Sequence, residues 1–81
     1  MQDLKVKKEL DCRGDLCPLP VYKTRLAMNQ LGVGDVLKVT CTDKGSLADI
    51  PALAREAGYE LVTSESNPKE QFFWLRKKGN P

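Results

Sequence analysis

The sequence contains no histidine, and this absence narrows the chemistry that is open to it. Without histidine there is no Cys–His dyad, no Ser–His triad and no imidazole ligand for a metal ion. The three cysteines are Cys12, Cys17 and Cys41. A zinc site would need a fourth ligand, and the spacing of Cys12 and Cys17 is too loose for the usual ligand pair. We therefore expect neither a resident metal ion nor a bound cofactor.

Long apolar runs and a strong net charge are also absent. No stretch approaches the roughly 20 apolar residues of a membrane span, and the N-terminal residues MQDLKVKKEL lack the apolar block of an export signal. An odd cysteine count in such a chain argues against a disulfide scaffold. The net charge is only +2, so strong nonspecific binding to nucleic acid is not indicated. We expect one domain over residues 1–81 in the cytoplasm, without a membrane or a nucleic acid as direct partner.

The pattern of apolar residues predicts four strands and two helices. The strands cover residues 4–12, 35–42, 59–65 and 71–77, and the helices cover residues 18–31 and from 46 or 49 to 57. The apolar face of the first strand carries Leu4, Val6, Leu10 and Cys12, and Lys8 interrupts it. Gly32 and Gly34 are expected to end the first helix and Gly58 the second.

The start of the second helix is open between two positions. Ser46 followed by Asp49 resembles a capping box, although with Asp in place of Glu. Pro51 would then lie past the first turn and remove a helix hydrogen bond. A start at Asp49 puts Pro51 inside the first turn, where no hydrogen bond is lost. The sequence slightly favours this later start or a short, distorted first turn.

The order strand, helix, strand, helix, strand, strand predicts an α/β fold, an α+β two-layer sandwich. Two crossover helices imply that the first three strands run parallel, and the short last turn makes the fourth antiparallel. Right-handed crossovers place both helices on one side when the strand order advances in one direction. We therefore expect a four-stranded mixed sheet with two helices on one face and the other face uncovered.

Cys17 lies in the stretch DCRGDLCPLP, where a turn gives way to the first helix. With Cys17 at the N-cap, Pro18 and Pro20 occupy first-turn positions where a missing N–H costs nothing. Pro20 cannot donate, which leaves the Leu19 amide as the natural local donor to the sulfur. This donor and the positive end of the helix dipole favour the thiolate, and such thiols have pKa values of roughly 3.5 to 7.5.

A thiolate without a histidine base suits attack on a sulfur electrophile, as in thiol–disulfide exchange or persulfide transfer. Arg13 would add positive charge near the thiol, and Asp15 would partly cancel it. On these residues alone, a reactive Cys17 and an ordinary helix start that contains a cysteine remain equally open. Cys12 and Cys41 lie on apolar strand faces and are expected in the core, close together if the first two strands are neighbours.

The cysteine also belongs to a longer pattern. The motif Cys17-Pro18-Leu19-Pro20 follows a strand that ends in Asp11, Arg13 and Gly14. Further positions of the pattern are Val21, Ala27-Met28, Leu31, Gly34, Thr42-Asp43, Asp49-Ile50-Pro51, Gly58, Glu60-Leu61, Phe73 and Leu75-Arg76-Lys77. Over residues 10–78 this pattern resembles the TusA/SirA-like family of small sulfur-carrier proteins.

The resemblance implies a βαβαββ sandwich like the C-terminal domain of bacterial translation initiation factor three. It also implies a carrier that accepts sulfur as a persulfide on Cys17 from a cysteine desulfurase or a rhodanese. The sulfur then passes to an acceptor protein that serves tRNA thiolation, molybdenum-cofactor maturation or sulfur metabolism, with no independent turnover expected. The residues expected to support the thiol are Asp11, Arg13, Gly14, Pro18, Leu19, Pro20, Asp43 and Asp49.

The sequence allows a structural and a functional explanation for each of two surfaces and for one pair of thiols. Leu19, Tyr22 and Leu26 form a second helical stripe, which is either ordinary surface apolarity or a partner-docking strip.

Phe72 and Trp74 are expected on the uncovered sheet face, with Lys5, Lys7 and Lys38 nearby. Aromatics among lysines stack nucleic-acid bases, which makes a small RNA-binding or regulatory module the rival function. Cross-strand pairing that stabilises the sheet is the simpler explanation of these side chains. A second rival is a thiol–disulfide module that uses Cys12 and Cys17.

Overall fold

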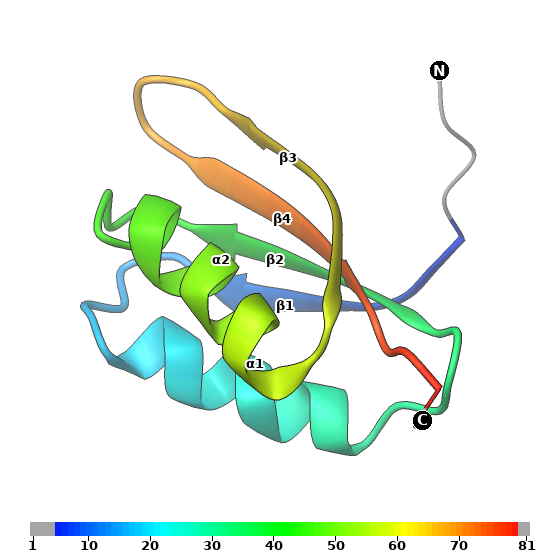
Figure 1. Ribbon diagram of the computed structural model, residues 1–81. Coiled ribbons are helices and arrows are strands. Elements are labelled where there is room, and N and C mark those ends of the chain that lie inside the picture. Colours follow the sequence, from blue (N-terminus) through cyan, green and yellow to red (C-terminus); the bar gives the residue numbers. More distant parts are fainter. Residues whose placement is uncertain (1–4, 80–81) are drawn as a thin grey trace.

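The structure is a computed structural model that describes residues 5–79 (Figure 1). The elements are β1 (Val6–Cys12), α1 (Leu19–Asn29), β2 (Val36–Cys41), α2 (Ser46–Ala57), β3 (Glu60–Ser66) and β4 (Gln71–Arg76). This is the predicted order, with each boundary within a few residues of the sequence-based range. Leu4, which the sequence assigned to the first strand, lies outside the described residues.

The four strands form one mixed sheet in the order β1-β2-β4-β3. β1 pairs parallel with β2, whereas β4 pairs antiparallel with both β2 and β3. The first three strands therefore point the same way, as predicted, and β4 lies between β2 and β3. Because β3 and β4 are antiparallel neighbours, a short turn is enough to join them. In this turn the Asn67 side chain accepts hydrogen bonds from the amides of Lys69 and Glu70 at 2.8 Å each.

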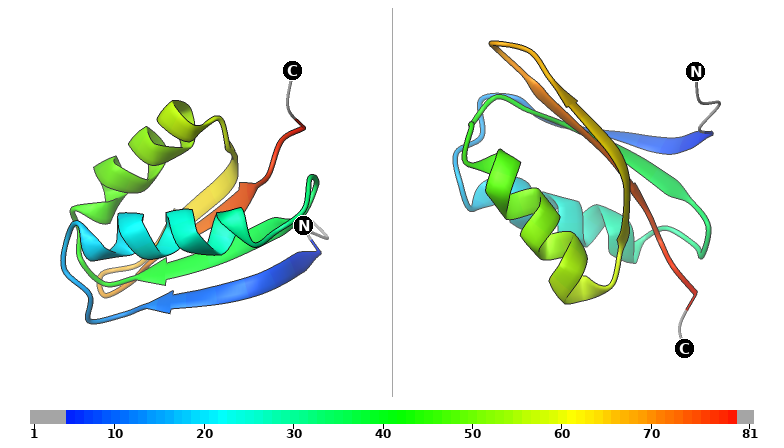
Figure 2. Two further views of the ribbon diagram at one scale, coloured as in Figure 1. Left: turned by 90° about the horizontal axis from the view of Figure 1, so that it is seen from below. Right: turned by 45° about the horizontal axis from the view of Figure 1, so that its top comes forward.

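Both helices cover the same face of the sheet, which confirms the predicted two-layer sandwich (Figure 2). The core lies between the layers and is built from side chains at alternate strand positions together with one face of each helix. Its buried members are Cys12, Ala27, Met28, Leu31, Leu37, Val39, Cys41, Ile50, Ala54, Phe73 and Leu75. Within residues 5–79, no helix has the length and apolar character that crossing a membrane requires.

The ends of α1 differ from the sequence-based expectation. The helix begins at Leu19 rather than at Pro18, and it ends at Asn29 with Gln30 in a right-handed conformation. The left-handed Gly34 (φ +90°) belongs to the turn before β2 and does not cap the helix. Gly58 does close α2 with φ +79°, as predicted.

The start of α2 at Ser46 shows that a start at Asp49 is wrong. The first amides of the helix donate to carbonyl oxygens three residues back, which is the distorted first turn that the sequence offered as the other possibility. Pro51 lies inside the helix and removes one backbone donor, yet the helix continues through it. The first turn is held instead by the carbonyl oxygens of Asp43, Lys44 and Gly45, which accept from amides at its start. The Ser46 side chain makes no capping hydrogen bond, so the predicted capping box is also absent.

A bulge in β1 changes which side chains share a face. Val6 pairs with Val36, but after the irregularity Lys8 pairs with Leu37 and Leu10 with Val39. Lys8 therefore lies on the same, helix-covered side of the sheet as Leu10. Val6 lies on the other side, and not on the apolar face where the alternation placed it.

Candidate functional site

Cys17 lies in the loop that joins the end of β1 to the start of α1, and its side chain is exposed. The loop turns at Gly14, where φ is +81° and only glycine is free of strain. The Asp15 amide donates to the Cys12 carbonyl at 3.1 Å, and the Gly14 amide donates to Thr42 Oγ1 at 2.8 Å. These bonds fix the loop between β1 and the residues that follow β2.

The helix does not begin at the cysteine. Pro18 occupies the N-cap, Pro20 lies in the first turn of α1, and the Cys17–Pro18 peptide bond is cis. The Leu19 amide donates to the Leu16 carbonyl at 2.8 Å. The predicted hydrogen bond from this amide to the sulfur is therefore wrong, because one residue of offset removes Cys17 from the cap position.

The backbone of Cys17 is held by Asp43 from the loop after β2. The Cys17 amide donates to Asp43 Oδ2 at 2.8 Å, and the Gly45 amide donates to Oδ1 at 3.0 Å. These two hydrogen bonds lower the pKa of Asp43, so the carboxylate stays ionised at neutral pH. The sequence named Asp43 as a candidate supporting residue, and in the structure its carboxylate holds the loop that carries the thiol.

Buried Gln71 supports the same loop from β4, and sequence reasoning missed it. In the orientation that gives both amide atoms partners, its NH₂ group donates to the carbonyl oxygens of Cys41 and Asp43, each at 3.2 Å. Its side chain is 1% exposed, so these bonds satisfy polar groups that water cannot reach. A polar residue on the core-facing side of a strand that is otherwise apolar was the available signal.

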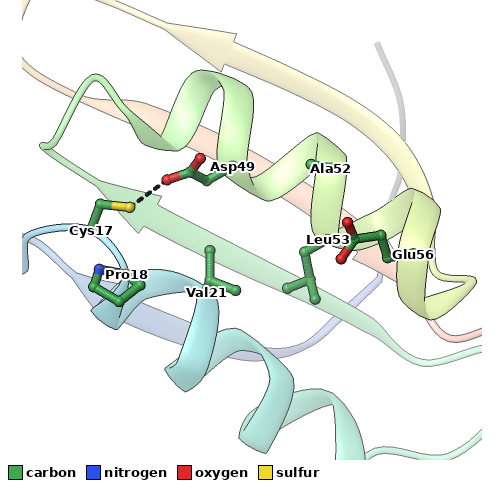
Figure 3. A pocket seen from close by; sticks show the side chains of 7 residues that line it. All are labelled: Cys17, Pro18, Val21, Asp49, Ala52, Leu53 and Glu56. Atoms are coloured by element: carbon green, nitrogen blue, oxygen red, sulfur yellow. Dashed lines mark hydrogen bonds between the residues drawn. The ribbon is translucent and has the colours of Figure 1, made fainter.

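The sulfur itself faces α2, where Asp49 lies opposite (Figure 3). Cys17 Sγ donates to Asp49 Oδ2 across 2.6 Å. This hydrogen bond raises the pKa of the Cys17 thiol, and the negative charges of Asp49 and Asp43 act in the same direction. The expected depression of the thiol pKa is therefore wrong for this arrangement, because the groups nearest to the sulfur are carboxylates.

A groove of about 250 Å³ runs from the thiol between the two helices. Its lining residues are Cys17, Pro18 and Val21 from the α1 side, and Asp49, Ala52, Leu53 and Glu56 from α2 (Figure 3). The sulfur lies at one end, the middle of the wall is apolar, and Glu56 adds a second carboxylate. The thiol is thus open to a reactant, with a surface beside it that can hold part of a larger partner.

Arg13 and Asp15 do not act on the thiol as the sequence suggested. Arg13 Nε lies 3.1 Å from Glu70 Oε2 and 3.8 Å from Asp11 Oδ1. Asp15 Oδ2 lies 2.7 Å from Lys23 Nζ. Asp11 also accepts the Arg13 amide at 2.9 Å, so these residues brace the end of β1.

Cys12 and Cys41 are both fully buried and pair directly across β1 and β2, which confirms their predicted place in the core. The hydrogen bond between the two thiols and their burial raise the pKa of Cys12. Both thiols are free. Among the residues from 5 to 79, no group of three or more His, Cys, Asp and Glu side chains is placed to hold a metal ion.

The predicted stripe on α1 faces solvent. Leu19, Tyr22 and Leu26 are 40%, 59% and 47% exposed, and Leu16 in the preceding loop is 73% exposed. The stripe begins beside the thiol, but its side chains do not line the groove described above. The stripe is therefore surface apolarity next to the site, and a docking role for it stays a prediction.

The uncovered sheet face carries Phe72 and Trp74, as predicted, with ring centroids 6.4 Å apart. Lys38 Nζ lies 5.3 Å from the Phe72 centroid and 5.4 Å from that of Trp74, a cation–π arrangement. Strand pairing also places acidic residues on this face, since Glu65 pairs with Phe72 and Glu9 with Lys38. The face is a mixture of charges around two aromatic rings.

Fold and site together define a small α+β domain that presents one exposed thiol between a strand and a helix. The sequence profile of the family described as "Sulfurtransferase TusA" matches residues 8–77. The chain belongs to this family.

Individual relatives agree with the family match. YrkF of Bacillus subtilis is 40% identical over 76 residues, which are 94% of this chain and 41% of YrkF, so this chain spans less than half of that protein. The sulfur carrier protein TusA of Allochromatium vinosum is 37% identical over 70 residues, covering 86% of this chain and 92% of TusA.

A solved structure shares the fold. The crystal structure of a SirA-like protein from Desulfitobacterium hafniense superposes with a TM-score of 0.73 and covers 89% of this chain and 99% of its own. The two sequences are 24% identical in this comparison.

Proposed function

We propose that this protein is a sulfur carrier in which Cys17 holds a sulfane sulfur as a persulfide. The observation that carries the proposal is the exposed Cys17 side chain, in a Cys-Pro-x-Pro motif within a chain of the TusA family. Relatives of similar length are named sulfur carrier proteins. The other two cysteines are buried, which leaves Cys17 as the thiol that a partner protein can reach.

The transfer needs a thiolate and a sulfur electrophile. Cys17 thiolate attacks the terminal sulfur of a donor persulfide, the donor S–S bond breaks, and its electron pair leaves on the donor cysteine. The product is Cys17–S–SH together with a donor thiolate. An acceptor thiolate then attacks the terminal sulfur of the Cys17 persulfide, the S–S bond breaks, and Cys17 leaves as a thiolate. No electron is gained or lost, so the relay needs no redox cofactor.

The donor in this proposal is a cysteine desulfurase or a rhodanese, and the acceptor is a protein of tRNA thiolation, molybdenum-cofactor maturation or sulfur metabolism in the cytoplasm. These expectations come from the family resemblance. Support for the carrier geometry comes from Gly14, which allows the turn, and from Asp43, which holds the Cys17 amide.

A mass measurement tests the proposal. The protein is incubated with a cysteine desulfurase and cysteine, and its intact mass is compared before and after treatment with a reducing agent. The expected product carries one additional sulfur that reduction removes. Cys17→Ser should carry none, whereas the matched Cys41→Ala variant should still be loaded. A sulfur adduct that persists in Cys17→Ser would contradict the proposal.

The two rival functions gain no comparable support. For RNA binding, Lys38 already lies over both aromatic rings, and Glu9 and Glu65 add negative charge to the sheet face. For a disulfide between Cys12 and Cys17, Cys12 is buried in the core beside Cys41, while Cys17 faces α2 and Asp49. We therefore put forward the carrier function alone.

A further inference from the structure

The charged side chains in and next to the groove beside Cys17 are carboxylates. Asp49 and Glu56 line it from α2, and Asp43 reaches the Cys17 backbone from the loop after β2. Of the neighbouring cations, Arg13 pairs with Glu70 and Lys23 with Asp15. Arg25, one turn after Val21 on α1, lines a separate pocket and is not part of this groove. An approaching reactant therefore meets a protonated thiol with carboxylates beside it.

The same acidic groups keep the resting thiol unreactive. The thiol proton is held in the hydrogen bond to Asp49, and the pKa of Cys17 is raised. Sulfur exchange requires the thiolate, so a partner has to change these surroundings before the reaction proceeds. A positive charge placed against Asp49 would do so, because it would take over the carboxylate oxygen that now accepts the thiol proton.

We propose that the groove receives partners that carry a lysine or arginine side chain next to their own reactive sulfur, and that this cation releases the Cys17 thiol by pairing with Asp49. The identity of the reactant as a sulfur donor or acceptor rests on the proposed function. Asp49 acts here as a positioning residue that couples partner docking to ionisation of the thiol.

The length of the groove adds a second element of recognition. Glu56 lies about two helical turns beyond Asp49, roughly 10 Å along the axis of α2. Val21 and Leu53 form the apolar wall in the same groove. A fitting segment thus has a cation near its sulfur, an apolar side chain next to it, and room for another cation opposite Glu56.

The step balances without any added oxidant. The partner cation replaces the thiol as the partner of Asp49, and the thiol proton passes to water. Cys17 thiolate attacks the terminal sulfur of the partner persulfide, and the electron pair of the broken S–S bond leaves on the partner cysteine. That thiolate takes up a proton, so that no net charge is created.

Small disulfides of different charge test the preference without any partner protein. The probes are cystamine, which is cationic, bis(2-hydroxyethyl) disulfide, which is neutral, and dithiodipropionate, which is anionic. In each reaction Cys17 thiolate attacks one sulfur, forms the mixed disulfide and releases one thiolate. Rates are measured from intact mass at low ionic strength and divided by the rates of N-acetylcysteinamide, an uncharged thiol. Cys17→Ser supplies the blank.

We expect the normalised rate with cystamine to exceed that with the neutral probe by about fivefold, the effect of one exposed ion pair at low salt. The anionic probe should be slower than the neutral probe by a similar factor. Asp49→Asn should reduce the cation preference and raise the rate with the neutral probe. Glu56→Gln should also reduce the preference, and it should raise the neutral-probe rate less than Asp49→Asn does, because Glu56 makes no hydrogen bond to the sulfur.

Glu65→Gln is the matched control, because it removes one exposed carboxylate on β3 that pairs with Phe72, on the sheet face away from the helices. Equal normalised rates for the three probes would overturn the proposal, as would a loss of preference in Glu65→Gln as large as in Glu56→Gln. A neutral-probe rate in Asp49→Asn no higher than in the wild type would overturn the role of Asp49. No persulfide takes part in these reactions, so a failure of sulfur loading is a separate result.

Discussion

The molecule keeps its sulfur atoms in two contrasting surroundings. Cys17 is exposed in a loop and meets the carboxylate of Asp49, whereas Cys12 and Cys41 are fully buried and meet each other across two parallel strands. In both places the pKa of a thiol is raised, at Cys17 by a carboxylate hydrogen bond and at Cys12 by the neighbouring thiol and burial. The first cause is reversible on partner binding, and the second is removed only by unfolding.

The largest expected difference between the two surroundings is in reactivity. In native buffer at pH 8, iodoacetamide should modify Cys17 at least about a thousandfold faster than Cys12 or Cys41, because the buried thiols react only after unfolding that costs several kcal/mol. Trypsin separates the three thiols into the peptides ELDCR, GDLCPLPVYK and VTCTDK. Label appearing in all three peptides at similar rates would remove the contrast.

Substitution of a buried cysteine should lower the free energy of unfolding more than substitution of the exposed Cys17. Cys41→Ser places a hydroxyl in the apolar core, and we expect it to lower the free energy of unfolding by about 1–3 kcal/mol. Cys17→Ser should leave that free energy essentially unchanged because its side chain is exposed. Urea denaturation of both variants measures this, and equal losses would show that Cys17 is part of the packing.

One glycine in the loop of the site and one at the end of α2 share the same backbone conformation. Gly14 and Gly58 have φ values of +81° and +79°, and a Cβ at either position would meet nothing within 4 Å. Alanine should therefore cost about 1–2 kcal/mol at each, from backbone strain alone. Only Gly14→Ala should also alter the alkylation rate of Cys17. An equal change in Gly58→Ala would show that the rate follows stability rather than the loop.

The smallest expected effect concerns pH. Because Asp49 raises the pKa of Cys17, the alkylation rate of the wild type should reach its midpoint at a higher pH than that of a free cysteine. Asp49→Asn should move this midpoint to lower pH, with the largest gain in rate below the midpoint and none where both proteins are fully ionised at Cys17. A midpoint that does not move in Asp49→Asn would mean that another group holds the thiol proton.

Much of the fold was predictable from local pattern. The alternation in residues 35–42, the helical period after Pro20 and the glycine at residue 58 each have one strong interpretation, and together they define a two-layer sandwich. The position of β4 between β2 and β3 depends on pairing between distant residues, which no local pattern specifies. The early start of α2 rests on hydrogen bonds to the carbonyl oxygens of Asp43, Lys44 and Gly45, a local turn that the position of Pro51 did not indicate.

The residues of the candidate site were more predictable than its electrostatics. Cys17, Asp43 and Asp49 were named as candidates from the sequence, and the structure brings the three together. The pKa direction failed because it depended on Leu19 as a donor, and a shift of one residue in the helix start assigned that amide to Leu16. Asp49 reaches the sulfur from another helix, a contact between residues far apart in the sequence. Glu56 and Gln71 became visible only with the packing of the two helices and of β4.

The most direct test of the central claim is the location of a transferred sulfur. After incubation with a cysteine desulfurase and cysteine, persulfides are capped with iodoacetamide so that the sulfur cannot migrate, and the protein is digested with trypsin. We expect the additional sulfur in GDLCPLPVYK, the peptide of Cys17, and in neither ELDCR nor VTCTDK. Additional sulfur in a peptide of the buried cysteines, with GDLCPLPVYK unmodified, would contradict it.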